Sequence, residues 1–125
     1  MDITRLSGLI IEAAMKVHSA LGPGLLENVY ESCLIHELRK IGLKVIAQLA
    51  LPVIYDGVTI DVGYRVDLIV EDCIIIELKT VEKILPIHEA QLLSYLKLSG
   101  RKLGLLINFD VVHLKNGSKR MANGI

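Results

Sequence analysis

The chain has 125 residues, the length of one domain, which predicts a single domain over residues 1–125. Hydrophobic residues make up 52% of it but aromatic residues only 4%, so the core must be built from Leu, Ile and Val. The 14 basic and 14 acidic residues cancel, unlike the charge of strong nucleic-acid binders, and no apolar run approaches the roughly 18 residues of a membrane span.

Two amphipathic helices are predicted at the start of the chain. Apolar residues recur at helical spacing over residues 3–21, with Asp2 in the position of an N-cap and Gly22-Pro23-Gly24 as the stop. A second apolar stripe predicts a helix over residues 25–41, which Gly42 ends.

The N-terminal segment and the cysteines indicate the cellular setting. The segment carries charges throughout, so it is not a secretory signal. Cys33 and Cys73 stand in apolar stretches without metal-type spacing. These features favour a reduced, cytoplasmic protein that does not associate with a membrane.

Antiparallel sheet is predicted in the middle of the chain. Residues 43–55 and 58–70 are rich in apolar and β-branched residues and flank Asp56-Gly57, a strong two-residue hairpin signal. Residues 73–79 form the next predicted strand. Consecutive strands joined by short turns predict an antiparallel meander.

The C-terminal part adds a helix and a buried strand. The helix is predicted over residues 87–99, with Pro86 near its start and Gly100 at its end, and the strand over residues 102–109. Residues 111–125 predict a short strand and a loose tail. The order is α-α-β-β-β-α-β, in which a helical crossover joins the meander to a further strand and makes a mixed α/β sheet.

Charge is unevenly distributed along the chain. Residues 1–78 carry 11 acidic and 6 basic residues, whereas residues 79–125 carry 3 acidic and 8 basic residues. The basic part could face the phosphates of a nucleic acid. It could equally be an ordinary solvated surface, and charge alone favours that interpretation.

Three charged residues interrupt the most hydrophobic strands. Glu77 and Lys79 are two positions apart, so they project from one face while Leu78 points into the core, and Asp67 lies on the partner strand. Charges inside buried strands are costly unless they are paired, hydrogen-bonded or bound to metal. Two carboxylates with a lysine beside them are the layout of a site for a hard divalent cation.

The register of these strands decides whether the site exists. A two-residue loop at Glu71-Asp72 would place Asp67 and Glu77 on opposite faces of the sheet. A three-residue loop would set Asp67 opposite Glu77, and a bulge near Asp67 could also bring them together. We therefore predict a three-residue loop or a bulge.

The motifs resemble a known superfamily of nucleases. Asp67 followed by Glu77-Leu78-Lys79 resembles the D…(D/E)-x-K signature of the PD-(D/E)XK nuclease superfamily. Residues 24–30 fit G-x-x-E-x-x-Y, the pattern of the GxxExxY protein family within it. The resemblance covers roughly residues 5–114 and includes three further stretches: GYRVDLIV (63–70), IELKTVEKILPIHEAQLLSYL (76–96) and GLLINF (104–109).

The resemblance implies a fold and a chemistry. The fold would be a restriction-endonuclease-like, three-layer α/β/α core around a mixed sheet. The activity would be metal-dependent hydrolysis of DNA, with Mg²⁺ or Mn²⁺ bound by Asp67, Glu77 and the carbonyl of Leu78. Lys79 would orient or deprotonate the attacking water, or stabilise the transition state.

Helical residues would support this site. Members of the superfamily use a helical acid near the metal, and Glu27 matches it as a ligand and catalytic residue. Without the resemblance, Glu27 is interpreted as a first-turn acid that stabilises its helix through the dipole. Tyr30, the last residue of the G-x-x-E-x-x-Y pattern, is assigned to substrate binding.

A polar line runs along the third predicted helix. His88, Gln91 and Tyr95 fall at i, i+3 and i+7. Gln91 and Tyr95 resemble the Q-x-x-x-Y element of the exonuclease-like branch, which implies that Gln91 orients water or phosphate and Tyr95 contacts the strand. The alternative is a buried hydrogen-bonding seam, with His88 structural rather than substrate-binding. Arg65 shares the strand face of Asp67 and would either pair with it or touch phosphate.

Three interpretations of the whole chain remain open. The first is the metal-dependent nuclease acting on DNA. The second is a binding or accessory module that keeps the fold, turns over little or nothing, and acts with a partner protein. The third is structural: Glu77 and Lys79 form an ion pair with Asp67 or Arg65. The high apolar content also suggests a homodimer.

Overall fold

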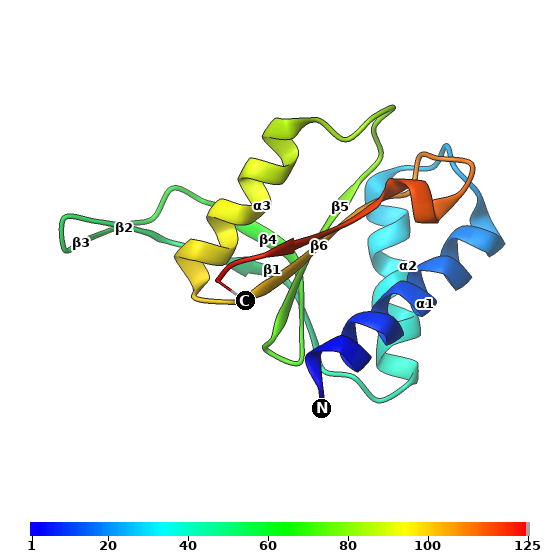
Figure 1. Ribbon diagram of the computed structural model, residues 1–125, viewed down its shortest axis with the longest axis horizontal. Helices are drawn as coiled ribbons and strands as arrows, with labels where there is room; N and C mark the ends of the chain where they lie inside the picture. Colours follow the sequence, from blue (N-terminus) through cyan, green and yellow to red (C-terminus); the bar gives the residue numbers. More distant parts are fainter. Residues whose placement is uncertain (125) are drawn as a thin grey trace.

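The computed structural model describes residues 1–124. Its helices and strands follow the predicted order, with the first hairpin divided into four strands (Figure 1). In chain order they are α1 (Ile3–Leu21), α2 (Glu27–Lys40), β1 (Val45–Ala50), β2 (Val53–Tyr55), β3 (Val58–Ile60), β4 (Arg65–Val70), β5 (Ile74–Lys79), α3 (Pro86–Ser99), β6 (Leu103–Asn108), the 3₁₀ turn η1 (Leu114–Gly117) and β7 (Ser118–Ala122).

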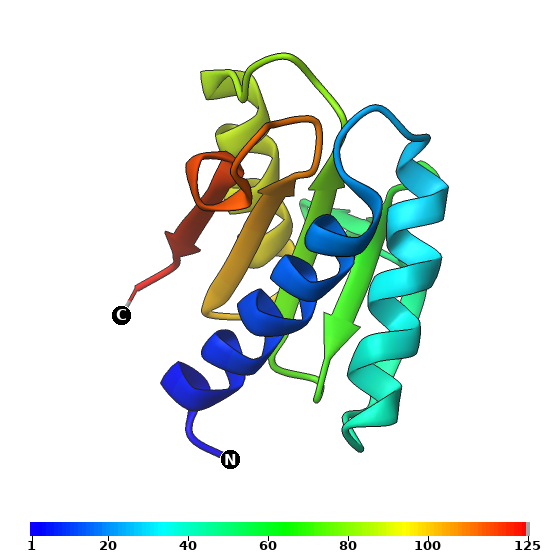
Figure 2. The same ribbon diagram turned by 90° about the vertical axis from the view of Figure 1, so that its right-hand side faces the viewer.

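The main sheet has five strands in the order β1-β4-β5-β6-β7. β5 and β6 are parallel and are joined by α3, whereas the other neighbouring strands are antiparallel. The predicted meander and helical crossover are therefore confirmed. In Figure 2, α1 and α2 cover the near face of this sheet and α3 lies behind it, which gives the expected three-layer α/β/α arrangement.

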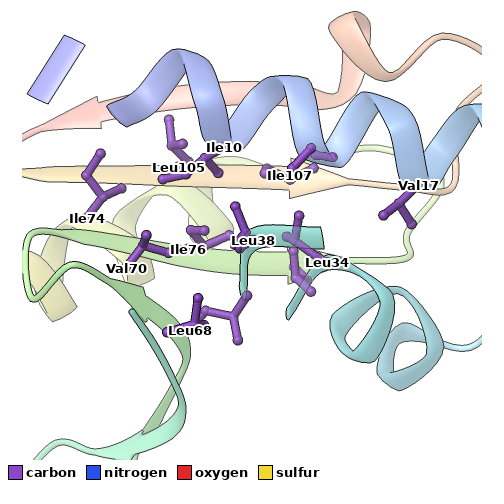
Figure 3. Packing of buried hydrophobic residues seen from close by; sticks show 14 of the residues in the cluster. Ile10, Val17, Leu34, Leu38, Leu68, Val70, Ile74, Ile76, Leu105 and Ile107 are labelled. Atoms are coloured by element: carbon purple, nitrogen blue, oxygen red, sulfur yellow. The ribbon is translucent and has the colours of Figure 1, made fainter. Parts of the chain in front are cut away.

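Two apolar cores hold the layers together. The larger core joins α1 and α2 to one sheet face, and Figure 3 shows its aliphatic side chains meeting between helices and strands. The smaller core joins α3 to the other face through residues such as Leu92 and Leu106. Each fully buried aliphatic side chain contributes about 1.5–3 kcal/mol. A core of Leu, Ile and Val with few aromatic residues is what the composition predicts.

The helices begin and end near the predicted positions. α1 has the predicted bounds, and the Asp2 side chain accepts a hydrogen bond from the Thr4 amide as an N-cap. α2 begins at Glu27 rather than at residue 25, because Leu26 has an extended backbone, with φ −68° and ψ 148°, and is the N-cap. No helix within residues 1–124 is long and apolar enough to cross a membrane.

The first predicted hairpin is divided into two parts. Its outer part, β2 with β3, pairs about the predicted Asp56-Gly57 turn as a separate two-stranded ribbon. Both turn residues have positive φ, as a tight hairpin turn requires. Pro52 lies where the long strand is interrupted, since proline cannot donate to a ladder. The ribbon projects from the body of the molecule in Figure 1.

The loop between β4 and β5 has the length on which the site depends. Val70 pairs with Ile74, which leaves residues 71–73 as a three-residue loop. Glu71 and Asp72 both have positive φ there, at 53° and 51°. The three-residue alternative is confirmed, and it sets Asp67 opposite Glu77 in register.

The short strand predicted near the C-terminus is confirmed. Residues 118–122 form the predicted short strand, β7, at the edge of the sheet. Ile125, the last residue of the predicted tail, lies outside the described residues.

Candidate active site

At Asp67 and Glu77, hydrogen bonds from backbone amides to side-chain oxygens connect β4 and β5 in place of backbone-to-backbone bonds. The Asp67 amide donates to Glu77 Oε1 at 3.2 Å, and the Leu78 amide donates to Asp67 Oδ2 at 2.8 Å. In a regular antiparallel pair, an amide that points to the partner strand donates to a backbone carbonyl instead. The two strands are therefore held together by carboxylates at this point, and both acids lie at one place on the sheet.

The environment of Glu77 disfavours a negative charge. The residue is 5% exposed. Burial raises the pKa of Glu77 to about 9, and the nearby charge of Asp67 contributes in the same direction. Within residues 1–124, no ion pair of 4.0 Å or less joins either acid to Lys79 or Arg65, so the structure does not support the ion-pair interpretation.

This pair of acids fits a small divalent cation. A buried, uncompensated pair of carboxylates is stabilised by a positive ion. In the described residues, no three or more His, Cys, Asp or Glu side chains are grouped closely enough to form a metal site by themselves. Mg²⁺ does not require such a group, because it keeps several waters and binds to one or two carboxylates.

At the site, the strand pair β1–β4 changes the face of the sheet to which its side chains point. On a regular strand, Val66 and Leu68 would face the same side. Here Leu68 packs in the larger core and Val66 in the smaller one. Between them lies Asp67, and opposite it Gln48 has a φ of +55°. This change of face takes Asp67 out of both cores and leaves its carboxylate free to bond to β5.

Gln48 also connects the sheet to α2. Its side-chain amide donates to Glu31 Oε1 at 2.9 Å. Glu31 lies one helical turn after Glu27, and its charge is among the influences that raise the pKa of Glu27. Neither Gln48 nor Glu31 belongs to a sequence motif, so the sequence carries no signal for this contact.

Glu27 is the first residue of α2 and faces the acids of the sheet. Partial burial, followed by the charge of Asp67, raises the pKa of Glu27, and Lys79 acts in the opposite direction. These influences place Glu27 within electrostatic range of both residues. Within residues 1–124, however, Glu27 does not join Asp67 and Glu77 in a three-acid group close enough to hold a metal ion by itself.

A cleft of about 500 Å³ opens beside these acids. Lys79 lies in its wall, and the polar line of α3 enters it as the helical spacing predicts. Burial, followed by the charge of Glu77, raises the pKa of Tyr95, which keeps its hydroxyl protonated and able to donate. The cleft is lined by Tyr64, Lys79, Ile87, His88, Ala90, Gln91, Ser94, Tyr95 and Leu98.

The end of β6 fixes the segment that leads from Lys79 to α3. Asn108 pairs with Lys79 in the parallel ladder and is 1% exposed. Its side chain accepts from the Val81 amide at 3.1 Å and donates to the Val81 carbonyl at 2.7 Å. The chain leaving β5 is therefore tied to the neighbouring strand just beyond the site.

Three residues assigned to substrate binding have other contacts. Tyr30 is fully buried, donates to the Gly22 carbonyl and stacks on Phe109, so it has no surface to offer a substrate. The Nδ1 atom of His88 accepts from the Leu85 amide at the start of α3, which is the structural role considered for it, although His88 also lines the cleft. Arg65 is exposed and unpaired with Asp67.

Comparison with known proteins identifies the class. The family model of the PD-(D/E)XK nuclease superfamily matches residues 4–121, almost the whole chain. The chain therefore belongs to the PD-(D/E)XK nuclease superfamily. No curated protein and no solved structure matches the chain. The narrower resemblance to the GxxExxY family stays a prediction.

Proposed function

We propose that the protein is a metal-dependent nuclease that hydrolyses phosphodiester bonds in DNA. The observation that carries the proposal is the pairing of Asp67 and Glu77 at one partly solvent-shielded place, where the pKa of Glu77 is raised to about 9. Membership of a nuclease superfamily supports the same chemistry. A divalent cation, Mg²⁺ or Mn²⁺, would compensate the two acids.

The chain offers several oxygen ligands for this ion. Asp67 and Glu77 would supply carboxylates, and Glu27 would complete the site directly or through water. The Leu78 amide points toward Asp67, and on an extended strand the carbonyl of the same residue points the same way. The Leu78 carbonyl oxygen would therefore be a further ligand for the ion. The ion would polarise the phosphate and lower the pKa of a bound water.

Residues beside the acids would handle the water and the phosphate. Lys79 would orient the attacking water or neutralise charge that develops on the phosphoryl oxygens. Gln91 would orient water or phosphate from the facing helix. Tyr95 would donate a hydrogen bond from its hydroxyl to the DNA strand, since its raised pKa keeps the proton in place.

One observation favours a second candidate function, an accessory module with little turnover. Two of the basic residues in the C-terminal part are used in ion pairs, Lys119 with Glu89 and Arg101 with Asp72. This leaves fewer cations to grip a nucleic acid, and a partner protein or a second copy of the chain would have to supply the remainder. The homodimer expected from the apolar content stays a proposal on the same ground.

Cleavage assays separate the two functions. Labelled single-stranded DNA, double-stranded DNA and RNA would be incubated with Mg²⁺ or Mn²⁺, with EDTA as the metal-free control. For a nuclease, Lys79→Ala should lower the rate about 100-fold or more. Lys102→Ala is the matched control, because Lys102 precedes β6 at the opposite end of the parallel strands from Lys79. Equal degradation by wild type and Lys79→Ala would indicate contamination and contradict the proposal.

A further inference from the structure

We propose that the cleft beside Lys79 binds one unpaired nucleotide, with its base stacked on Tyr64. This inference rests on the proposed nuclease function and names the form of its substrate: single-stranded DNA or a frayed end. Tyr64 lies in the stretch GYRVDLIV (63–70), but the resemblance assigns it no role in catalysis, metal binding or substrate binding.

The two tyrosines of the cleft differ in exposure. The ring centroids of Tyr64 and Tyr95 are 5.9 Å apart, with an angle of 52° between the ring planes. Tyr95 is only 7% exposed, whereas Tyr64 is 44% exposed. Tyr95 therefore supports Tyr64 from behind, and Tyr64 presents open ring surface to solvent at the edge of the cleft.

The backbone holds Tyr64 in place. The Leu51 amide donates to the Tyr64 carbonyl at 2.9 Å, which ties this residue to the segment between β1 and β2. Just before it, the Gly63 amide donates to the Asp61 carboxylate at 3.1 Å. The ring is therefore attached to an ordered backbone, which lowers the entropy cost of using it as a stacking surface.

The chemistry of the cleft suits a nucleotide. Lys79 is the only fully charged residue in its lining as described, and the lining contains no carboxylate. A phosphate would lie toward Lys79, while Tyr64, Ile87 and Leu98 offer apolar surface to a base. Stacking on an aromatic ring accepts every base, because each has a π-face.

An unpaired base satisfies this geometry and a paired base does not. Within a duplex, both faces of a base are stacked against its neighbours, so Tyr64 could contact one only after it had been unstacked. A cleft of about 500 Å³ also has room for a nucleotide but not for a double helix. The cleft therefore selects single strands and frayed ends.

Binding can be measured without cleavage. All variants would carry Asp67→Asn, which removes one ligand charge but keeps an oxygen to accept the Leu78 amide. Fluorescence anisotropy in EDTA would then compare a labelled single-stranded oligonucleotide with the same sequence as a duplex. The variants are Tyr64→Ala and Tyr64→Phe, with Tyr55→Ala as the matched control, because Tyr55 is 71% exposed at the hairpin turn and does not line the cleft.

The inference predicts a specific pattern of affinities. Single-stranded DNA should bind more tightly than duplex, and Tyr64→Ala should weaken its binding about 10-fold or more, while Tyr64→Phe and Tyr55→Ala stay within about twofold of the parent. Unchanged binding by Tyr64→Ala, equal loss for single strands and duplex, or no binding by the parent would overturn the inference. In each of those cases, cleavage that depends on Lys79 would still support the nuclease function. Failure of the nucleotide-binding inference can therefore be distinguished from failure of the proposed function.

Discussion

The amide of Asp67 donates to the side-chain oxygen of Glu77 at 3.2 Å, and this bond joins the two acids on which the proposed function depends. The Asp67 carboxylate in turn accepts from the amide that follows Glu77, at 2.8 Å. Each acid is thus held by the strand of the other. Their positions are set by backbone atoms, so the pair is preorganised before any ion or substrate arrives.

The stability of the metal-free protein should depend on Glu77. In the folded protein Glu77 keeps its proton up to about pH 9, but in the unfolded chain it releases the proton near its ordinary pKa of 4.5. Between these values the unfolded chain binds fewer protons, so the free energy of unfolding falls as pH rises. We expect the Tm in EDTA to drop by on the order of 10 °C from pH 5 to pH 9.

Glu77→Gln should flatten this profile, because glutamine keeps an oxygen for the Asp67 amide and does not titrate. Glu82→Gln, at an exposed position beyond β5, is the matched control and should keep the wild-type slope. Thermal melts across the pH range give the comparison. Parallel profiles for wild type and Glu77→Gln would contradict the raised pKa.

Tyr30→Phe should destabilise the protein without removing a substrate contact. The Tyr30 hydroxyl donates to the Gly22 carbonyl at 2.6 Å and accepts from the Leu25 amide at 3.0 Å. Loss of the hydroxyl leaves two partly buried backbone groups without this partner, at a cost of about 1–3 kcal/mol. Urea denaturation measures this cost, and Tyr55→Phe, at an exposed position, should leave the midpoint unchanged. The account of Tyr30 fails if both variants unfold at the same urea concentration as wild type.

At position 48, a glycine variant should be more stable than an alanine variant, the reverse of an ordinary strand position. Both substitutions remove the bond to Glu31, so their difference reports the backbone alone. At a φ of +55°, Gln48→Gly should be more stable than Gln48→Ala by about 1 kcal/mol. At Ala50, in the same strand, glycine should instead be less stable than alanine by about 0.5–1 kcal/mol. Denaturant titration would reveal the opposite signs, and equal signs would mean that Gln48 is not strained.

Much of the fold is predictable from the sequence because the spacing of its apolar residues is regular. The apolar spacing of α1 and the short apolar runs of β5 and β6 each match one element of the structure. The requirement that Asp67 and Glu77 share a site leaves two alternatives, a three-residue loop before β5 or a bulge near Asp67, and the structure has the loop. A chemical constraint thus excluded the two-residue loop, which local propensity leaves open.

Other features have no local signal or a misleading one. Glutamine has no preference for positive φ, so the backbone conformation of Gln48 in β1 depends on tertiary structure. Tyr30 was assigned to the substrate from its motif, although it lies on the inward stripe of its helix, which is the signal of burial. Tyr64 lies outside any regular strand or helix, and only the folded chain brings it beside Tyr95.

Anomalous diffraction from a crystal soaked in Mn²⁺ tests the central claim most directly. The account predicts one strong peak within about 2.0–2.3 Å of a carboxylate oxygen from each of Asp67 and Glu77, and no such peak in Asp67→Ala. Lys102→Ala would serve as the control that keeps the peak. Full Mn²⁺ occupancy elsewhere on the molecule, with nothing between these two acids, would contradict a metal-dependent nuclease built on them.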